Sequence, residues 1–334
     1  MTGKGNNLTY FVIENSARFL QIELMIVVNC ISTAASFLLF YMILWHSKKE
    51  KRHSRVVNFL QNLFLYLAQF HWGNAGVVNL LPFPAIYCNG PYSYFFNTLH
   101  LGTFWMMYFC TFVLMMFMVI LIRLKAISRS YHCFDWKLST YTGITAVFII
   151  LIFGPVPYSW ITANFSPDLM REYVIQYFPK CLKVLEIPGI LVFVDVSLMR
   201  QLVISATCSL ALGGLTYLFF CFAIIYEIRQ QSATTSAKHL NYHRKILKDT
   251  IVQNIFRFTV LVIPPMVFFK NALLDPSDDT ITASILANAF YVGAPIPCAI
   301  VICYQNTVYR EFLKGKLMFW RKEKTVVHKV SAGG

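Results

Sequence analysis

The chain has 334 residues, of which 57% are hydrophobic and 13% are charged, and its mean hydropathy is +0.56. In soluble globular domains roughly a quarter of all residues are charged, so this composition excludes that class and predicts an integral membrane protein. The net charge of +14 does not indicate nucleic-acid binding, because the basic residues lie between long apolar segments and are not interleaved with stacking aromatic residues.

Seven apolar segments are each long enough for the roughly 20 residues that a helix needs to cross a bilayer. The expected crossings are residues 19–45, 56–81, 95–122, 140–163, 201–226, 250–269 and 282–303. The predicted fold is therefore an all-α bundle of seven transmembrane helices. The first 18 residues lack the apolar core of a secretory signal, so we expect the first crossing itself to direct insertion.

Basic residues are concentrated in four of the segments outside the crossings. The segments before the second, fourth and sixth crossings and the C-terminal tail carry net charges of +4, +3, +3 and +5. Cytoplasmic loops are the ones enriched in Lys and Arg, so this pattern predicts an external N-terminus and a cytoplasmic C-terminus. We expect an extracellular segment over 1–18, the bundle over 19–303 and a cytoplasmic tail over 304–334.

The sixth crossing carries its strongly polar residues on one helical face. Asp249, Gln253 and Arg257 follow one another at intervals of four residues. Two interpretations of Arg257 stay open: its side chain extends to the cytoplasmic interface, or it pairs with polar groups of the second or seventh crossing as part of a switch. Pro264 and Pro265 remove two amide donors and predict a bend in the outer third of this helix.

The second crossing also has a polar stripe, which we expect to face the bundle and to bond neighbouring helices; a ligand site is the alternative. It contains Asn58, Asn62, Tyr66 and Gln69. Residues of the third, sixth and seventh crossings and of the start of the tail could transmit a helix movement to the cytoplasmic side. The candidate switch and coupling residues are Arg123, Gln253, Arg257, Pro264, Pro265, Asn288, Tyr309 and Arg310.

Candidates for ligand contact lie near the outer ends of the second and third crossings. His71, Asn74 and His100 fit ligand contact and structural hydrogen bonding equally well. The third crossing is rich in Met and aromatic residues, which form either ordinary packing and lipid-facing surface or an adaptable apolar pocket. The candidate pocket consists of His71, Asn74, His100, Trp105 and Tyr108.

The predicted topology places two cysteines and two glycosylation motifs on the outer side. Cys88 and Cys181 would share an oxidising compartment, so we expect a disulfide that ties the long outer loop over the bundle; two separate thiols are the alternative. Asn7 and Asn164 each begin an Asn-x-Ser/Thr acceptor motif and are the expected glycosylation sites.

The tail predicts a short helix that lies on the inner leaflet, because apolar residues recur there at helical spacing with basic residues between them. The apolar positions are Tyr309, Phe312, Leu313, Leu317 and Trp320. Catalytic motifs such as HExxH, GxSxG or a Gly-rich phosphate loop do not occur, so we expect no enzyme, no metal and no cofactor. The seventh crossing also has no lysine that could form a retinal Schiff base.

Three segments resemble the nematode chemosensory seven-helix receptors of the Str superfamily, most closely its Srh and Sri branches. They are the outer-loop run REYVIQYFPKCLKVLEIPGILVFVDV, the entry to the sixth helix HRKILKDTIVQNIFRFTVLVIPPMVFF, and the ending YQNTVYREFLKG after the seventh helix. The resemblance covers nearly the whole chain. It implies the fold of a G-protein-coupled receptor.

The resemblance further implies that the chain binds an external small molecule, such as an odorant or pheromone, and activates a heterotrimeric G protein. It implies a place in the plasma membrane, in the cilia of sensory neurons. The expected partners are therefore the ligand, the G protein and the lipid bilayer, without nucleic acid. The alternative is a ligand-gated channel or small-solute transporter, which would predict inverted repeats or broken, charged helices at the midplane, and the sequence shows no such repeat.

Overall fold

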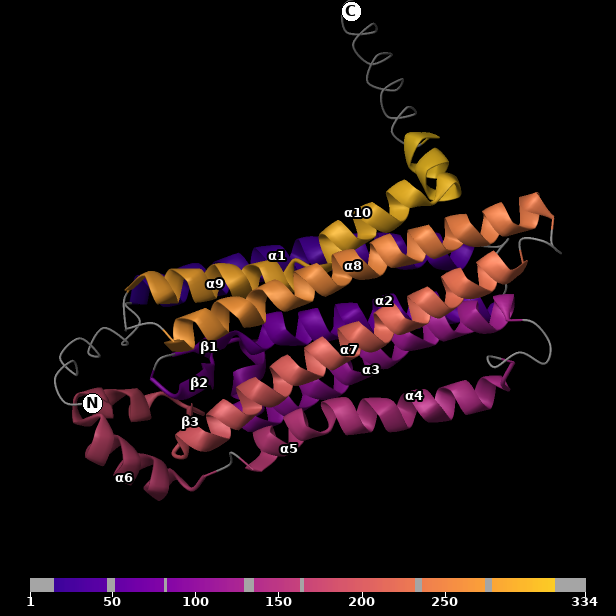
Figure 1. The fold of residues 1–334 in the computed structure, drawn as a ribbon. Helices are drawn as coiled ribbons and strands as arrows, with labels where there is room; N and C mark the ends of the chain where they lie inside the picture. The colour runs from indigo at the N-terminus through magenta and orange to yellow at the C-terminus, as the bar shows by residue number, and fades with distance from the viewer. Residues whose placement is uncertain are drawn as a thin grey trace, which may run out of the picture.

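The computed structural model describes residues 15–46, 52–80, 83–128, 135–162, 165–231, 236–273 and 278–315. Long helices lie side by side in one bundle, and most of them extend along its length (Figure 1). The helices are α1 (Asn15–Tyr41), α2 (Arg52–Ala75), α3 (Thr98–Ile127), α4 (Leu138–Phe153), α5 (Pro155–Thr162), α6 (Pro167–Tyr177), α7 (Val196–Gln230), α8 (Ala237–Leu273), α9 (Asp278–Val292) and α10 (Pro295–Gln305).

Five helical segments within the described ranges are long and apolar enough to cross a membrane: Gln21–His46, Thr98–Ile127, Ser139–Thr162, Ile204–Gln230 and Thr282–Gln305. The two other predicted crossings correspond to α2 and α8. These helices carry the polar stripes, which lower their hydropathy, and residues of both stripes are buried between helices. The prediction of an all-α bundle with seven crossings is confirmed.

Two predicted crossings are each built from a pair of helices because proline interrupts them. The fourth crossing divides at Gly154 into α4 and α5, and the seventh divides at Gly293 and Ala294 into α9 and α10. Pro155 and Pro295 are the first residues of α5 and α10. Proline fits this position because the amides of a helix's first turn have no intrahelical partner.

Helix α3 runs through the centre of the bundle and supplies much of its core. Phe112, Phe117, Ile120 and Leu121 are each at most 1% exposed. They pack in one cluster with residues of α2, α4, α7, α8 and α9. By contrast, many large apolar residues on the outer faces of α1, α4 and α7 are exposed, which is expected of surfaces that face lipid.

The outer end of the bundle carries a small antiparallel sheet that the sequence analysis did not predict. Its strands are β1 (Val77–Asn79), β2 (Ala85–Cys88) and β3 (Leu191–Val192), in the order β1-β2-β3. Val77 pairs with Cys88, and Ala85 pairs with Val192, so the sheet joins the first outer loop to the long second one. The predicted second crossing, 56–81, is corrected at its outer end, because α2 ends at Ala75 and Val77–Asn79 form β1.

The second outer loop covers one face of this sheet. Helix α6 and the 3-10 helix Pro179–Glu186 bury Val174, Cys181 and Val184 against it. The other face turns toward the bundle, where Val77 and Cys88 pack with Leu101 of α3. The sheet is thus an apolar layer between the loop helices and the bundle.

Two side chains anchor the sheet to the bundle by bonding the same carbonyl group. The Val77 oxygen accepts from Gln21 Nε2 at 3.3 Å and from Asn288 Nδ2 at 3.0 Å. Gln21 belongs to α1 and Asn288 to α9, so one strand residue ties both helices to β1.

The turn after β2 lies so close to the end of α2 that only glycine fits at position 90. A Cβ on Gly90 would lie 2.1 Å from the Asn74 carbonyl oxygen and 2.7 Å from the Ala75 carbonyl carbon. We expect Gly90→Ala to destabilise the chain by about 1–3 kcal/mol, because two backbone segments must move apart. Thermal unfolding in detergent measures the effect.

The matched control is Gly143→Ala in α4, where a new Cβ would meet nothing within 4 Å. Alanine is the better helix former, so this variant should gain about 0.5–1 kcal/mol or stay unchanged. Equal melting temperatures for the two variants would contradict the close approach at Gly90.

Candidate functional site

A hydrogen-bonded network centred on Arg257 lies inside the inner half of the bundle. Arg257 is 2% exposed, and its Nη1 and Nη2 donate to Asn254 Oδ1 at 2.8 Å and to Asn62 Oδ1 at 2.9 Å. Asn254 Nδ2 donates to the Tyr217 hydroxyl at 2.7 Å, and Gln61 Nε2 donates to Asn254 Oδ1 at 3.2 Å. The network therefore connects α8 with both α2 and α7.

The Arg257 charge is held by neutral groups. Within the described ranges no carboxylate forms an ion pair with it, and its Nε has no hydrogen-bond partner there. A buried guanidinium without an acid is costly to keep out of water, and two amide oxygens offset only part of that cost. Of the two interpretations left open above, the structure shows Arg257 inside the bundle, bonded to the second crossing.

On the inner side of this network is a cavity of about 670 Å³. Helices α2, α3, α7, α8 and α10 all contribute to its lining, which includes the candidate residues Arg123, Gln253, Arg257 and Tyr309. Gln253 Nε2 donates to Gln305 Oε1 at 2.8 Å and so ties α8 to α10. Four of the predicted switch residues are thus brought together around one space.

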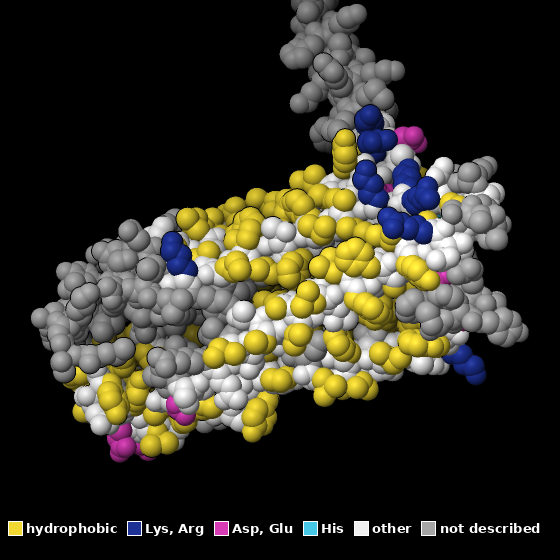
Figure 2. Space-filling model, in the orientation of Figure 1, with side chains coloured by type: hydrophobic (Ala, Val, Ile, Leu, Met, Phe, Trp, Pro, Cys, Tyr) yellow, Lys and Arg dark blue, Asp and Glu magenta, His cyan; other side chains and the backbone are white. Residues whose placement is uncertain are grey.

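The rim of this cavity is basic. Lys125, Lys245 and Arg123 line it, and Asp249 interacts electrostatically with Arg123, Lys245 and Lys248. On the face drawn in Figure 2, most Lys and Arg side chains gather at the end of the bundle where α10 ends, while its middle is hydrophobic. A partner that enters the cavity would meet positive potential.

The other predicted switch residues lie elsewhere. Helix α8 continues as one helix through Pro264 and Pro265. Asn288 is 1% exposed in the outer half, where Oδ1 accepts from Trp72 Nε1 at 2.9 Å. Arg310 lies in the helical residues 307–315 after α10, with its guanidinium 5.9 Å from the ring centroid of Tyr304. Leu317 and Trp320 of the predicted tail helix lie outside the described residues.

The five residues of the predicted ligand pocket do not form one pocket. His71 is buried, with Nε2 2.9 Å from the Leu101 carbonyl oxygen and its ring 5.7 Å from that of Tyr108. His100 is exposed near the start of α3, where its amide donates to the capping Asn97. Asn74 lines a separate cavity between α1 and α2.

Trp105 belongs to an aromatic cluster at the centre of the outer half. Its Nε1 donates to the Tyr291 hydroxyl at 2.9 Å, and its ring lies 4.7 Å from Trp72. Trp72 in turn bonds Asn288. These rings fill the space among α2, α3 and α9, so this part of the predicted pocket is packed with side chains.

The expected disulfide between Cys88 and Cys181 is not formed in the structure. Alternation along β2 explains this: Ala85 and Tyr87 face the loop helices with Cys181, whereas Cys88 points to the opposite face, toward Leu101. The sheet therefore separates the two sulfurs. Burial raises the pKa of the Cys88 thiol to about 12, which keeps it protonated. Asn7 and Asn164 lie outside the described residues.

Several residues that now appear central were not selected from the sequence: Gln61, Trp72, Tyr217, Asn254, Tyr291 and Gln305. Asn254 lies three positions before Arg257, so it shares a helical face with it. An i, i+3 pair of polar residues within an apolar helix was a signal that could have identified Asn254. For the other residues, periodicity carries no information about which side chain of another helix is the partner.

A family model and solved structures are similar to this chain. The family model described as "Serpentine type 7TM GPCR chemoreceptor Srh" matches residues 15–319. The crystal structure of squid rhodopsin is similar with a TM-score of 0.42 and 11% sequence identity, over 92% of this chain and 87% of that chain. No curated protein matches this chain. Since the family model spans far more than half of the sequence, the chain belongs to the Srh family of serpentine seven-transmembrane G-protein-coupled chemoreceptors.

Proposed function

We propose that the chain binds an external small-molecule cue, such as an odorant or pheromone, and activates a heterotrimeric G protein at its inner cavity. The single observation that carries this proposal is the Arg257 network, which joins α2, α7 and α8 directly above a cavity lined by the ends of five helices. A ligand that favours a different arrangement of these helices would change the cavity's shape. Family membership supports the same role.

The network is suited to a switch because its hydrogen bonds offset only part of the free-energy cost of burying the guanidinium charge. Arg257 has two amide acceptors and no carboxylate partner within the described ranges. Separating α8 from α2 would break one of these bonds at Asn62 and leave the guanidinium to the water of the inner cavity. The free-energy difference between the two arrangements can therefore be small, which a switch requires.

The basic rim fits a G-protein segment that carries negative charge. We expect Lys245→Glu, at the rim on α8, to lower the rate of nucleotide exchange by the G protein about tenfold at low salt. The measurement is uptake of a non-hydrolysable GTP analogue by a purified heterotrimer mixed with the chain in nanodiscs. At 1 M salt the difference from the wild type should shrink, because exposed charges are then screened.

The control is Lys270→Glu, which makes the same charge change on an exposed residue at the other end of α8. It should leave nucleotide exchange unchanged. Equal effects of the two substitutions, or no exchange by the wild type with any class of heterotrimer, would argue against G-protein coupling through the inner cavity.

The proposed topology has an external N-terminus, a cytoplasmic C-terminus and a place in the plasma membrane of sensory cilia. The concentration of Lys and Arg at the end of the bundle that includes the end of α10 supports this orientation (Figure 2). We expect Asn7→Gln and Asn164→Gln each to remove one glycosidase-sensitive mobility shift in microsomes. A shift gained only from an acceptor motif engineered between residues 48 and 55 would instead indicate the reverse orientation.

A further inference from the structure

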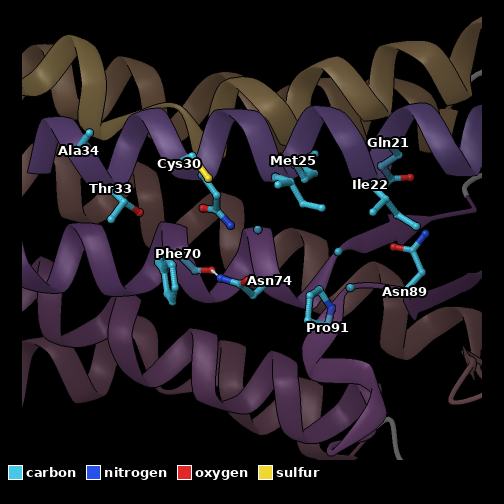
Figure 3. A pocket seen from close by; sticks show the side chains of 15 residues that line it. Gln21, Ile22, Met25, Cys30, Thr33, Ala34, Phe70, Asn74, Asn89 and Pro91 are labelled. Atoms are coloured by element: carbon cyan, nitrogen blue, oxygen red, sulfur yellow. Dashed lines mark hydrogen bonds between the residues drawn. The ribbon is translucent and has the colours of Figure 1, made fainter.

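We propose that a cavity between the outer halves of α1 and α2 binds a small uncharged molecule that combines an apolar body with one hydroxyl or carbonyl group (Figure 3). The proposal rests on the receptor role proposed above and names the chemical class of its ligand. This cavity is separate from the predicted pocket, with which it shares only Asn74.

The cavity has a volume of about 450 Å³. Ligand sites for small molecules commonly enclose about 300–1,000 Å³, so the space is sufficient for a volatile or semi-volatile organic molecule. Helix α1 forms one wall, α2 the opposite wall, and the turn after β2 closes the outer end (Figure 3). Residues on these three walls include Met25, Cys30, Phe70, Asn74, Asn89 and Pro91.

The lining excludes charged ligands. None of the described residues that line it is Asp, Glu, Lys, Arg or His, and Ile22, Met25 and Phe70 make much of the surface apolar. A carboxylate or ammonium group would lose its hydration in this space without gaining a partner of opposite charge. An apolar chain or ring, in contrast, makes van der Waals contacts with the lining side chains that are missing while the cavity is empty.

Unsatisfied amides at the outer end select for a polar group on the ligand. Gln21 is 1% exposed, and its Nε2 donates to the Val77 carbonyl while its Oε1 has no partner within the described ranges. The buried Nδ2 and Oδ1 atoms of Asn89 also have no hydrogen-bond partner among the described residues. Buried polar groups in this state are uncommon, and a ligand hydroxyl would supply both a donor and an acceptor.

The walls around these amides are held in place by close contacts. A Cβ on Gly73 would lie 2.4 Å from Asn29 Nδ2, so the Asn29 side chain of α1 packs directly on the α2 backbone there. Asn74 Nδ2 donates to the Phe70 carbonyl oxygen at 2.8 Å, which fixes the side chain on the cavity wall (Figure 3). The cavity is therefore preformed, and ligand binding needs little reorganisation.

The cavity is accessible from the bilayer face and lies next to the junction of sheet and bundle. Ile26 and Cys30 line it and are exposed on α1, where a molecule dissolved in lipid can reach them. Gln21 shares the Val77 carbonyl with Asn288 of α9. A ligand that bonds Gln21 thus lies one hydrogen bond away from the group that joins β1 to α9.

The test uses 1-octanol as the probe and Cys30 as the reporter, with the full chain in phosphatidylcholine nanodiscs. N-ethylmaleimide labels the thiol, and mass spectrometry of the peptides gives its rate. At a probe concentration ten times the dissociation constant, we expect labelling of Cys30 to slow about tenfold, because only about a tenth of the cavities remain empty. Cys208, an exposed cysteine on α7, should be labelled at an unchanged rate.

Two comparisons test the polar part of the proposal. Octane and octanoate should protect Cys30 much less than octanol does. Gln21→Leu should raise the octanol concentration for half protection about tenfold, because one ligand hydrogen bond is lost. The matched control is Gln69→Leu, which replaces another 1%-exposed glutamine on α2 that does not line the cavity, and it should leave protection unchanged.

Octanol that fails to protect Cys30, or that slows Cys208 equally, would overturn the site. Equal protection by octane or octanoate would overturn the proposed ligand class. The labelling needs no G protein, so a chain that binds octanol without stimulating nucleotide exchange would contradict only the proposed function.

Discussion

Replacing Arg257 by Met together with Asn62 by Leu should raise ligand-independent nucleotide exchange about 5- to 150-fold, without lowering the thermal stability of the chain. The exchange assay with a purified heterotrimer measures the first effect, and thermal unfolding in detergent measures the second. The two readouts separate a switch from a purely structural contact.

The physical reason lies in what the pair contributes to each property. Arg257 is fully inside the bundle and has only amide acceptors within the described ranges, so replacing it and Asn62 by apolar residues removes a desolvated charge and its partner together. Such replacements are often neutral or stabilising by about 1–4 kcal/mol. The same replacement removes the Arg257–Asn62 bond between α8 and α2 and leaves only the longer bond from Gln61 to Asn254, which weakens the hold on the inner end of α8.

Arg244→Met is the matched control, because Arg244 is an exposed residue of the same helix outside the network. It should change neither property. The single variant Arg257→Met should be less stable than the double variant, because it leaves the buried Asn62 oxygen without its donor. A double variant that melts at lower temperature and keeps wild-type exchange would show that the network is only structural.

Asn288→Leu should destabilise the chain by about 2–5 kcal/mol, the largest loss of stability that we expect from a single substitution. Asn288 is 1% exposed and uses both ends of its amide, as acceptor from Trp72 Nε1 at 2.9 Å and as donor to the Val77 carbonyl oxygen at 3.0 Å. Leucine keeps the branching at Cγ but is larger and cannot form hydrogen bonds, so the Trp72 indole N–H loses its acceptor and the Val77 carbonyl keeps only Gln21 as a side-chain donor. Thermal or denaturant unfolding measures the loss.

A double-mutant cycle with Trp72→Phe isolates the bond between the two side chains. Its coupling energy should be about 1–3 kcal/mol, because phenylalanine retains most of the ring contact but has no donor. Asn241→Leu, the same change at an exposed position of α8, should stay within about 0.5 kcal/mol of the wild type. Additive effects of the Asn288 and Trp72 substitutions would contradict the bond.

The bundle could be predicted from the sequence because its signals are local. Apolar length locates the crossings, and the four-residue spacing of Gln253 and Arg257 indicates a polar face. Which neighbour that face meets depends on helix packing: Gln253 bonds Gln305 of α10, whereas Arg257 turns to Asn62 of α2. No local sequence pattern shows that Gln253 and Arg257 have partners on different helices, so the sequence alone leaves both interpretations of Arg257 open.

The outer sheet could not be predicted, because its strands have only two to four residues and the pairing partners lie far apart in the sequence. Ala85 pairs with Val192, more than 100 positions later. Without the sheet, nothing in the sequence indicated that Cys88 and Cys181 face opposite sides of one layer, where the structure forms no disulfide between them. The candidate ligand residues are dispersed because the orientation of each helix in the bundle, like the strand pairing, is set by distant parts of the chain. Asn74 faces α1, and Trp105 faces α9.

The distance between the inner ends of α2 and α8 tests the switch most directly. Nitroxide labels on ketone-bearing residues at Val56 and Tyr242, both exposed, report it by pulsed electron spin resonance. We predict one narrow distance distribution for the wild type in nanodiscs and an additional, longer component for the variant with Arg257→Met and Asn62→Leu. Identical distributions for the two proteins would contradict the account, because the network would then not hold α8 to α2.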